Sequence, residues 1–149
     1  MTEYRCYTLT HFMLSSIQQG IQSGHAAMEL VNKYYQCEPV YKVDEEQFDV
    51  VLSWIRDNKT IICLNGGNSE SMIDWVEFLD TYHNKFPWVT FHEDENSLEG
   101  ILTSIAIILP NWFYEVDPND DLFVDIHSRE FTAWELELLT RIKSASLAR

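Results

Sequence analysis

The sequence predicts an α/β protein in which helices cover both faces of a four-stranded mixed sheet. Two observations support this fold class. Short apolar runs of strand-like composition alternate with longer segments in which apolar residues recur at helical spacing. One run, "TIICL" at residues 60–64, is apolar throughout, as expected for a strand that is covered on both sides. The predicted order is β-α-α-β-α-β-β, followed by an aromatic and acidic extension that ends in a helix.

The first strand and the first helix lie in the opening 34 residues. Residues 4–10 alternate like a strand, and Ser15 or Ser16 can cap a helix that extends to about Lys33. Glycines at positions 20 and 24, one turn apart, indicate close approach of this helix to the sheet or to a ligand. The side chains expected to face inward are Ile17, Ile21, His25, Met28 and Leu30.

A second helix, the apolar strand and a third helix occupy the centre of the chain. The second helix begins after Asp44, with Gln47 three residues on in a capping-box pattern. A turn at residues 65–69 follows the strand, and Ser69 is expected to cap the third helix. The apolar faces expected for the two helices comprise Phe48, Val51, Leu52 and Ile55 in the second, and Met72, Ile73, Val76 and Leu79 in the third.

The last two strands are predicted at residues 86–91 and 103–109, on either side of a polar loop, "HEDENSLEG". The extension contains a strand-like run, "LFVDI", and a final helix that Ser128 is expected to cap. That helix is expected to pack through Phe131, Trp134, Leu138 and Ile142. Because 149 residues suit a single core and no linker interrupts them, we expect one domain, with a core at residues 4–110 and the extension at residues 111–149.

The chain is acidic, and its charge is unevenly distributed. The formal net charge is −14, and residues 61–128 contain 13 acidic residues against one basic residue, Lys85. A protein that neutralises nucleic-acid phosphates needs a lysine or arginine patch, which is not visible here, so nucleic-acid binding is disfavoured. The acidic surface is expected either to keep the protein soluble or to dock on a partner protein with a basic surface.

The cysteines and histidines predict neither a metal site nor a cofactor. The cysteines at positions 6, 37 and 63 lack CxxC spacing, and the five histidines lack H-x-x-x-H or H-x-H spacing. We therefore expect reduced, structural thiols in a cytoplasmic protein. The longest apolar run, Ile105–Leu109, is too short to cross a bilayer, and the opening "MTEYRCYT" does not have the pattern of a secretory signal.

The segment "SSIQQGIQSGHA", residues 15–26, resembles the first helix of type 2 peptidyl-tRNA hydrolases, which reads G-K-G-K-x-A-A-Q-x-x-H-A. Gln22, His25 and Ala26 agree with that pattern, and Gly24 fills the small position before the histidine. A helix end, "SWIRDNK", and the order of the later elements extend the resemblance over residues 4–110. It implies a three-layer α/β/α core around four strands.

The resemblance also implies where a hydrolytic site would lie. In the family, a lysine early in the first helix, an aspartate after the third strand and a nearby threonine serve the cleavage of the ester between peptide and tRNA. Gln18 stands at the lysine position here. Asp94, or Glu93 in a gapless reading, stands for the aspartate, and Ser97 stands for the threonine. Gln18 carries no charge, and the crowded carboxylates of this loop repel a polyanionic substrate.

Other residues are candidates on their own chemistry. His11 lies in the loop after the first strand, where Asp94 or Glu93 across the cleft could pair with it for acid–base work. His25 and Gln22 are candidate binding residues on the first helix, although a histidine at such an inward position is more often a hydrogen-bonded core residue. Trp112 and Phe113 in "NWFYEV" belong either to a contact surface or to extra core over the sheet.

Two main functions remain open. The favoured one is a protein-binding module on a peptidyl-tRNA-hydrolase-like scaffold that lacks the hydrolase activity. As a small acidic domain, the chain is also similar to accessory proteins encoded by large tailed phages of the T-even type, which would make a host factor its partner. The alternative is hydrolysis of peptidyl-tRNA or a related ester or amide by a divergent site, such as His11, Gln18 and Asp94. Binding of a small ligand at the same cleft and mimicry of nucleic-acid charge stay open as well.

Overall fold

The computed structural model describes residues 2–34, 44–93, 100–115 and 131–148. In these residues four strands form one sheet of order β2-β1-β4-β3. The strands are β1 (Tyr4–His11), β2 (Thr60–Gly67), β3 (Trp88–His92) and β4 (Leu102–Pro110). β1 is parallel to β2 and antiparallel to β4, and β3 is antiparallel to β4, so the predicted mixed sheet is confirmed.

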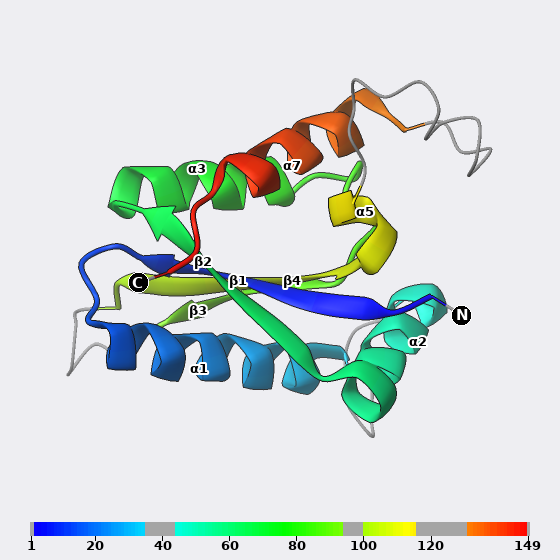
Figure 1. Ribbon diagram of the computed structural model, residues 1–149, viewed down its shortest axis with the longest axis horizontal. Coiled ribbons are helices and arrows are strands. Elements are labelled where there is room, and N and C mark those ends of the chain that lie inside the picture. The colour runs from blue at the N-terminus through cyan, green and yellow to red at the C-terminus, as the bar shows by residue number, and fades with distance from the viewer. Residues whose placement is uncertain (1, 35–43, 94–99, 116–130, 149) are drawn as a thin grey trace.

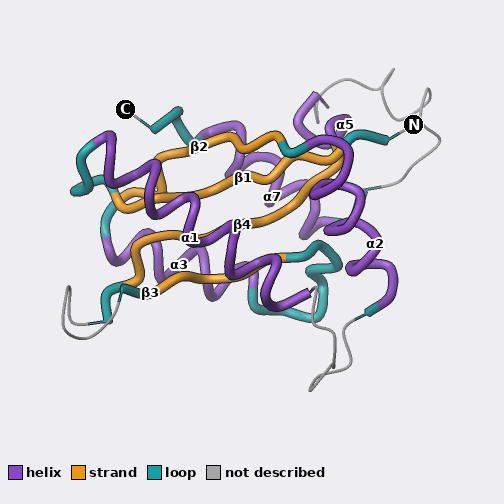
Figure 2. Tube along the Cα trace, turned by 90° about the horizontal axis from the view of Figure 1, so that it is seen from below, coloured by secondary structure: helices purple, strands orange, loops and turns teal. Residues whose placement is uncertain are grey.

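Helices lie on both faces of this sheet, which confirms the three-layer α/β/α arrangement (Figure 1). One layer consists of α1 (Ser16–Tyr34) and α2 (Glu45–Ser53), and the other of α3 (Ser69–Leu79) and α7 (Ala133–Ser144). A single helical turn, α5 (Asn111–Glu115), follows β4. Viewed from its own side of the sheet, α1 crosses the middle of the sheet, with β2 and β3 at the two edges (Figure 2).

The connection from β1 to its parallel neighbour β2 runs through α1 and α2, and a π-helical turn at Trp54–Asn58 ends it. Lys59 follows in the left-handed conformation, with φ at 55°. The buried Trp54 donates its indole N–H to the carbonyl of Thr60 at 2.9 Å, which fixes the entry into β2. Asp44 caps α2 as predicted, but the side chain of Gln47 donates to the Lys85 carbonyl and forms no capping box.

The predicted inward stripe of α1 is wrong apart from Leu30, which is buried. Ile17, Ile21 and Met28 are exposed, and His25 is half-buried. The buried side chains of this helix are Gln19, Gln22, Ser23, Ala26, Ala27, Leu30 and Tyr34. The orientation of α1 depends on the strands beneath it. β1 and β4 present buried hydroxyl groups to the first half of α1, and these groups need hydrogen-bond partners. Gln22 and Ser23 supply the partners, and the helix is rotated accordingly.

The opposite face of the sheet contacts the larger apolar core. Trp75 is buried on α3, whereas the predicted core residue Ile73 is 54% exposed. The cap of α3 is Asn68, whose side chain accepts the N–H of Ser71 at 2.8 Å, and not Ser69. β2 continues to Gly67, so part of the predicted turn at residues 65–69 is strand. The buried members of this core are Tyr7, Leu9, Leu64, Met72, Trp75, Leu79, Ile105, Ile107, Leu109, Phe113, Leu138, Leu139 and Ile142.

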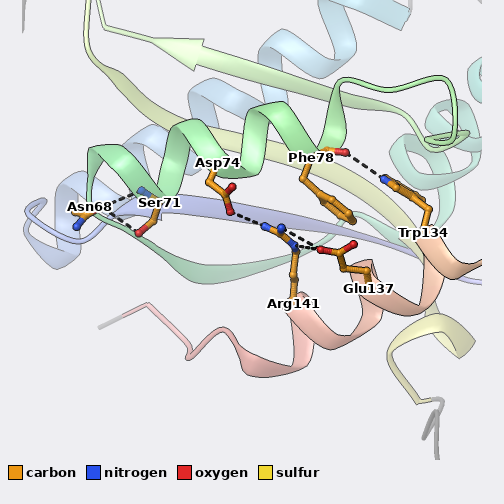
Figure 3. Close-up of polar contacts among 7 residues, drawn as sticks. All are labelled: Asn68, Ser71, Asp74, Phe78, Trp134, Glu137 and Arg141. Atoms are coloured by element: carbon orange, nitrogen blue, oxygen red, sulfur yellow. Dashed lines mark hydrogen bonds and ion pairs between the residues drawn. The ribbon is translucent and has the colours of Figure 1, made fainter.

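The extension docks on α3 through one arginine and one tryptophan of α7 (Figure 3). Arg141 donates to Asp74 at 2.8 Å and to Glu137 at 3.1 Å, and its guanidinium lies 4.3 Å from the ring centre of Phe78. Burial lowers the pKa of Arg141, but its hydrogen bonds to the two carboxylates outweigh that effect and raise it. Trp134 donates to the Phe78 carbonyl at 3.1 Å and stacks on the Phe78 ring.

The residues after α7 run along the free edge of β2. Asn65 donates its N–H to the Ser146 carbonyl at 2.8 Å, and Ala148 donates to the Cys63 carbonyl at 2.9 Å. This pairing blocks an edge that would otherwise be open to another strand. Thr132 caps α7 in a full capping box with Glu135. The predicted cap Ser128 and the run "LFVDI" lie outside the described residues.

Candidate functional site

A buried polar cluster connects α1 to the ends of β3 and β4. The side-chain amide of Gln22 donates to a carboxylate oxygen of Glu93 at 2.7 Å and accepts the hydroxyl of Thr103 at 2.9 Å. Ser104 donates its hydroxyl to the Gln22 carbonyl at 2.8 Å. Gln22, Thr103 and Ser104 are buried, while Glu93 is half-buried. Since both heteroatoms of the Gln22 amide are engaged, this residue positions the carboxylate of Glu93 and joins helix to sheet.

A second set of polar contacts lies beside this cluster. The hydroxyls of Ser23 and Thr8 share a hydrogen bond of 2.8 Å, and the Cys63 thiol donates to Ser23 at 3.3 Å. Cys6 is fully buried, and burial raises the pKa of its thiol far above the ordinary value of 9.0. A thiol kept protonated in this way is a poor nucleophile, so Cys6 is structural. Cys37 lies outside the described residues.

Gln18, at the position of the family's lysine, is exposed on the first turn of α1. Its side-chain oxygen accepts the N–H of Ser15 at 3.1 Å, and the Ser15 hydroxyl accepts the N–H of Gln18 at 3.3 Å. This reciprocal pair caps the helix. The predicted cap at Ser15 is therefore confirmed, and Gln18 contributes hydrogen bonds but no positive charge. Asp94 and Ser97 lie outside the described residues.

His11 hydrogen-bonds Ser69 across the ends of β1 and α3, with 2.9 Å between Nε2 and Oγ. The other ring nitrogen, Nδ1, accepts the N–H of Met13 at 3.2 Å. In the neutral ring Nε2 therefore carries the proton and donates to Ser69, whereas a general base would have to accept the serine proton there. The described partner of Glu93 is Gln22, so the predicted pairing of Glu93 with His11 is not formed.

The remaining predicted binding residues are mostly packing residues. The half-buried ring of His25 rests on Phe91 with 4.8 Å between ring centres, and its Nδ1 has no hydrogen-bond partner among the described residues. Phe113 is fully buried in the core beneath α7, so it is not part of a contact surface. Trp112 is half-buried and packs against Phe113 and Phe131. The reason is that α5 folds back after β4 and fills the space beside α7.

An exposed apolar surface lies on α1 and the loop before it, and the sequence pattern did not predict it. This surface, the α1 strip, consists of Phe12, Met13, Ile17, Ile21 and Met28, which are 49, 72, 77, 50 and 70% exposed. The chain has no charged residue between Phe12 and Met28. Gly20 and Gly24 lie within the strip, and a Cβ at either position would meet no atom within 4 Å. The close approach of the sheet that we predicted at these glycines is therefore wrong.

Two further findings concern only the residues that the structure describes. No three histidine, cysteine, aspartate or glutamate side chains in them converge as metal ligands would. None of their helices is long and apolar enough to span a membrane.

Comparisons with known proteins give no family assignment. A scan against models of protein families found no match, and a search of curated proteins found no matching sequence. The resemblance to type 2 peptidyl-tRNA hydrolases therefore stays a prediction that rests on residues 4–110.

Proposed function

We propose that this protein is a non-catalytic binding module on a peptidyl-tRNA-hydrolase-like scaffold, and that it binds another protein through the α1 strip. The observation that carries the proposal is the exposure of five large apolar side chains on an uncharged stretch of 17 residues. Single exposed apolar residues are common on protein surfaces, but a continuous uncharged strip is typical of an interface. On the inward face of the same helix Gln22 pairs with Glu93 and Leu30 is buried, so the exposed side chains of the strip are not what packs α1 on the sheet.

The partner in this proposal carries a basic surface around an apolar centre. The chain has a formal net charge of −14. A partner with a basic rim would therefore be attracted electrostatically during diffusion and would associate faster than a partner with a neutral rim. Reduced thiols at Cys6 and Cys63 fit the reducing cytoplasm, where we place the protein. An accessory protein of a large tailed phage that binds a basic host factor would have these properties.

Two residues support a lack of hydrolase activity. Gln18 is neutral and engaged in capping α1. His11 donates its Nε2 proton to Ser69 and does not accept a proton there. Stabilising the negative charge that develops during ester cleavage needs a nearby cation or preorganised donors, and the sequence has no lysine or arginine from Cys6 to Asn32.

The interface is tested by affinity capture with the tagged protein from extracts of its source cells. Ile21→Glu is expected to abolish recovery of the specific partner, because a buried unpaired charge opposes binding. The matched control is Ile73→Glu, which places the same charge at an isoleucine of similar exposure on α3, in the opposite layer. A partner that is lost equally with both variants, or retained with both, would show that the α1 strip is not the contact surface.

The alternative function, hydrolysis by a divergent site, is favoured by one observation, the positioning of the Glu93 carboxylate by Gln22 beside Thr103. Release of N-acetylated amino acid from aminoacyl-tRNA by the purified protein distinguishes the two functions. We expect no rate above the uncatalysed background. A clear rate that Glu93→Gln removes would establish the hydrolase and overturn the non-catalytic proposal.

A further inference from the structure

A cavity of about 630 Å³ opens at the end of the sheet where β1 begins and β4 ends. His11, at the other end of β1, does not line it. Its walls come from separate elements of the fold, namely β1, α2, the loop between α3 and β3, the junction of β4 with α5, and the start of α7. The volume lies within the range of small-molecule sites, which is about 300–1,000 Å³.

Four aromatic side chains from three parts of the chain contribute to the walls. They are Tyr4, Tyr82, Phe86 and Trp112. Tyr82 is exposed at the rim, and the other three are half-buried, so they offer fixed ring surfaces rather than mobile ones. Aromatic ring faces carry negative electrostatic potential and attract ammonium and guanidinium groups.

The charged groups of the cavity point to the same class of ligand. Glu135 lines it with only 9% of its surface exposed, and one oxygen of its carboxylate accepts the N–H of Thr132 at 3.1 Å in the α7 capping box. Glu46 lines it from α2. The exposed Lys85 and the imidazole of His83 also belong to the walls, so the two carboxylates outnumber the lysine and arginine side chains among the described lining residues. The net charge of −14 adds a field that repels anions and attracts cations.

We propose that this cavity binds the alkylammonium group of an organic amine between its aromatic walls and the carboxylates of Glu46 and Glu135. The group can come from a free polyamine or from a lysine side chain of a bound protein. The inference is independent of the proposed function, because no residue of the α1 strip lines the cavity.

Isothermal titration of the purified chain at physiological ionic strength tests the proposal with two probes. The first is spermidine, and the second is the blocked peptide acetyl-Gly-Lys-Gly-amide. Saturable binding of either probe is the expected result, and which probe binds identifies the source of the amine. Absence of saturable binding with both probes would overturn the proposal.

Charge variants distinguish binding in the cavity from general electrostatic attraction of the amine to an acidic protein. Glu46→Gln is expected to weaken binding about two- to fivefold, the range for a partly solvated ion pair, whereas Glu45→Gln leaves it unchanged. Glu45 is the adjacent exposed carboxylate and lies outside the cavity walls, so the two variants change the net charge equally. Equal weakening by both variants would show non-specific charge attraction and overturn the proposal.

Two further variants probe the opposite charge and the aromatic wall. Lys85→Gln is expected to strengthen binding about two- to fivefold, since it removes the repelling cation, while Lys59→Gln outside the cavity has no effect. Tyr82→Ala is expected to weaken binding about two- to fivefold through loss of a cation–π contact, and Phe12→Ala serves as its control. Weakening by Lys85→Gln would indicate an anionic ligand and contradict the assignment.

Discussion

The two faces of the sheet are held by different physical means. The face under α3 and α7 presents large apolar side chains of the strands, among them Tyr7, Leu9 and Ile107. These side chains share one apolar core with Leu138 and Ile142 of α7. The face under α1 combines a second apolar cluster, which includes Leu30 and Ile108, with hydrogen bonds made by Gln22 and Ser23. The first layer is stabilised mainly by burial of apolar area, whereas the second also depends on the pairing of buried polar groups.

This difference explains the unusual orientation of α1. A helix that buries glutamine and serine has its larger apolar residues left over for the outside, which is where Ile17, Ile21 and Met28 lie. On α3 and α7 the apolar residues face inward in the ordinary way, apart from Ile73 and the marginally exposed Leu136. Exposed apolar residues on a helix can therefore result from the polarity of the strands beneath that helix.

The largest loss of stability is expected from a substitution on the apolar face of the sheet. Leu138→Ala removes a fully buried side chain from α7 and should lower the free energy of unfolding by about 2–5 kcal/mol, since it loses apolar burial and leaves a cavity. Urea unfolding followed by circular dichroism measures it. Leu136→Ala, two residues away and partly exposed, is the control and should cost well under half as much. A similar loss in both would show that this core is loosely packed.

A smaller effect is expected on the polar face. Gln22→Leu leaves the buried hydroxyl of Thr103 without its acceptor and should destabilise the protein by about 1–3 kcal/mol. The double variant Gln22→Leu/Thr103→Val should recover part of that loss, because it removes the unsatisfied group as well. Urea unfolding of the three proteins provides the measurement. If Gln22→Leu alone proved stabilising, the hydrogen bonds would not be what holds α1 to the sheet.

The buried thiol on the polar face predicts a dependence on pH. The pKa of Cys6 is raised above 9.0 in the folded protein, so in alkaline solution the unfolded chain loses a proton that the folded chain keeps. Stability is therefore full below pH 8 and falls as pH rises through 9, by about 1 kcal/mol at pH 9.5. Urea unfolding at pH 7.5 and 9.5 detects the change. Cys6→Ala should reduce the difference between the two pH values, and an unchanged difference would assign it to other groups.

The smallest change in stability is expected from a substitution on the outer surface of α1. Ile17→Gln should change the free energy of unfolding by no more than about 0.5 kcal/mol, because this side chain is mostly solvated already. Leu30→Gln, on the buried side of the same helix, should be strongly destabilising and serves as the reference. Thermal unfolding of both variants suffices. A cost above about 1 kcal/mol for Ile17→Gln would mean that another part of this chain covers the strip.

Much of the fold was predictable from local patterns. The order of strands and helices, the cap at Asp44 and the burial of Leu138 and Ile142 follow from periodicity and capping preferences. The errors concern which side of a helix is buried, as at Ile17 on α1 and Ile73 on α3. Hydrophobicity alone assigns that side in a sequence, whereas in the fold it also depends on the residues of the strands beneath.

The candidate site was predictable as a set of residues but not as a set of contacts. Gln22 and Glu93 were both predicted and do meet, while Thr103, which completes their cluster, was missed. A threonine in an apolar strand gives no signal of its own in a single sequence. His11 was a candidate to pair with Glu93 or Asp94; it hydrogen-bonds Ser69, Glu93 contacts Gln22, and Asp94 lies outside the described residues.

The sequence by itself determined the acidic charge, the order of the elements and the α/β class, because these depend on composition and on neighbours within a few residues. Tertiary structure alone decided which way α1 faces and what its polar side chains bind. The partners of Gln22 lie 71 and 81 residues further along the chain, at Glu93 and Thr103. Buried polar groups must be paired, and only the folded sheet brings residues at such separations within hydrogen-bonding distance.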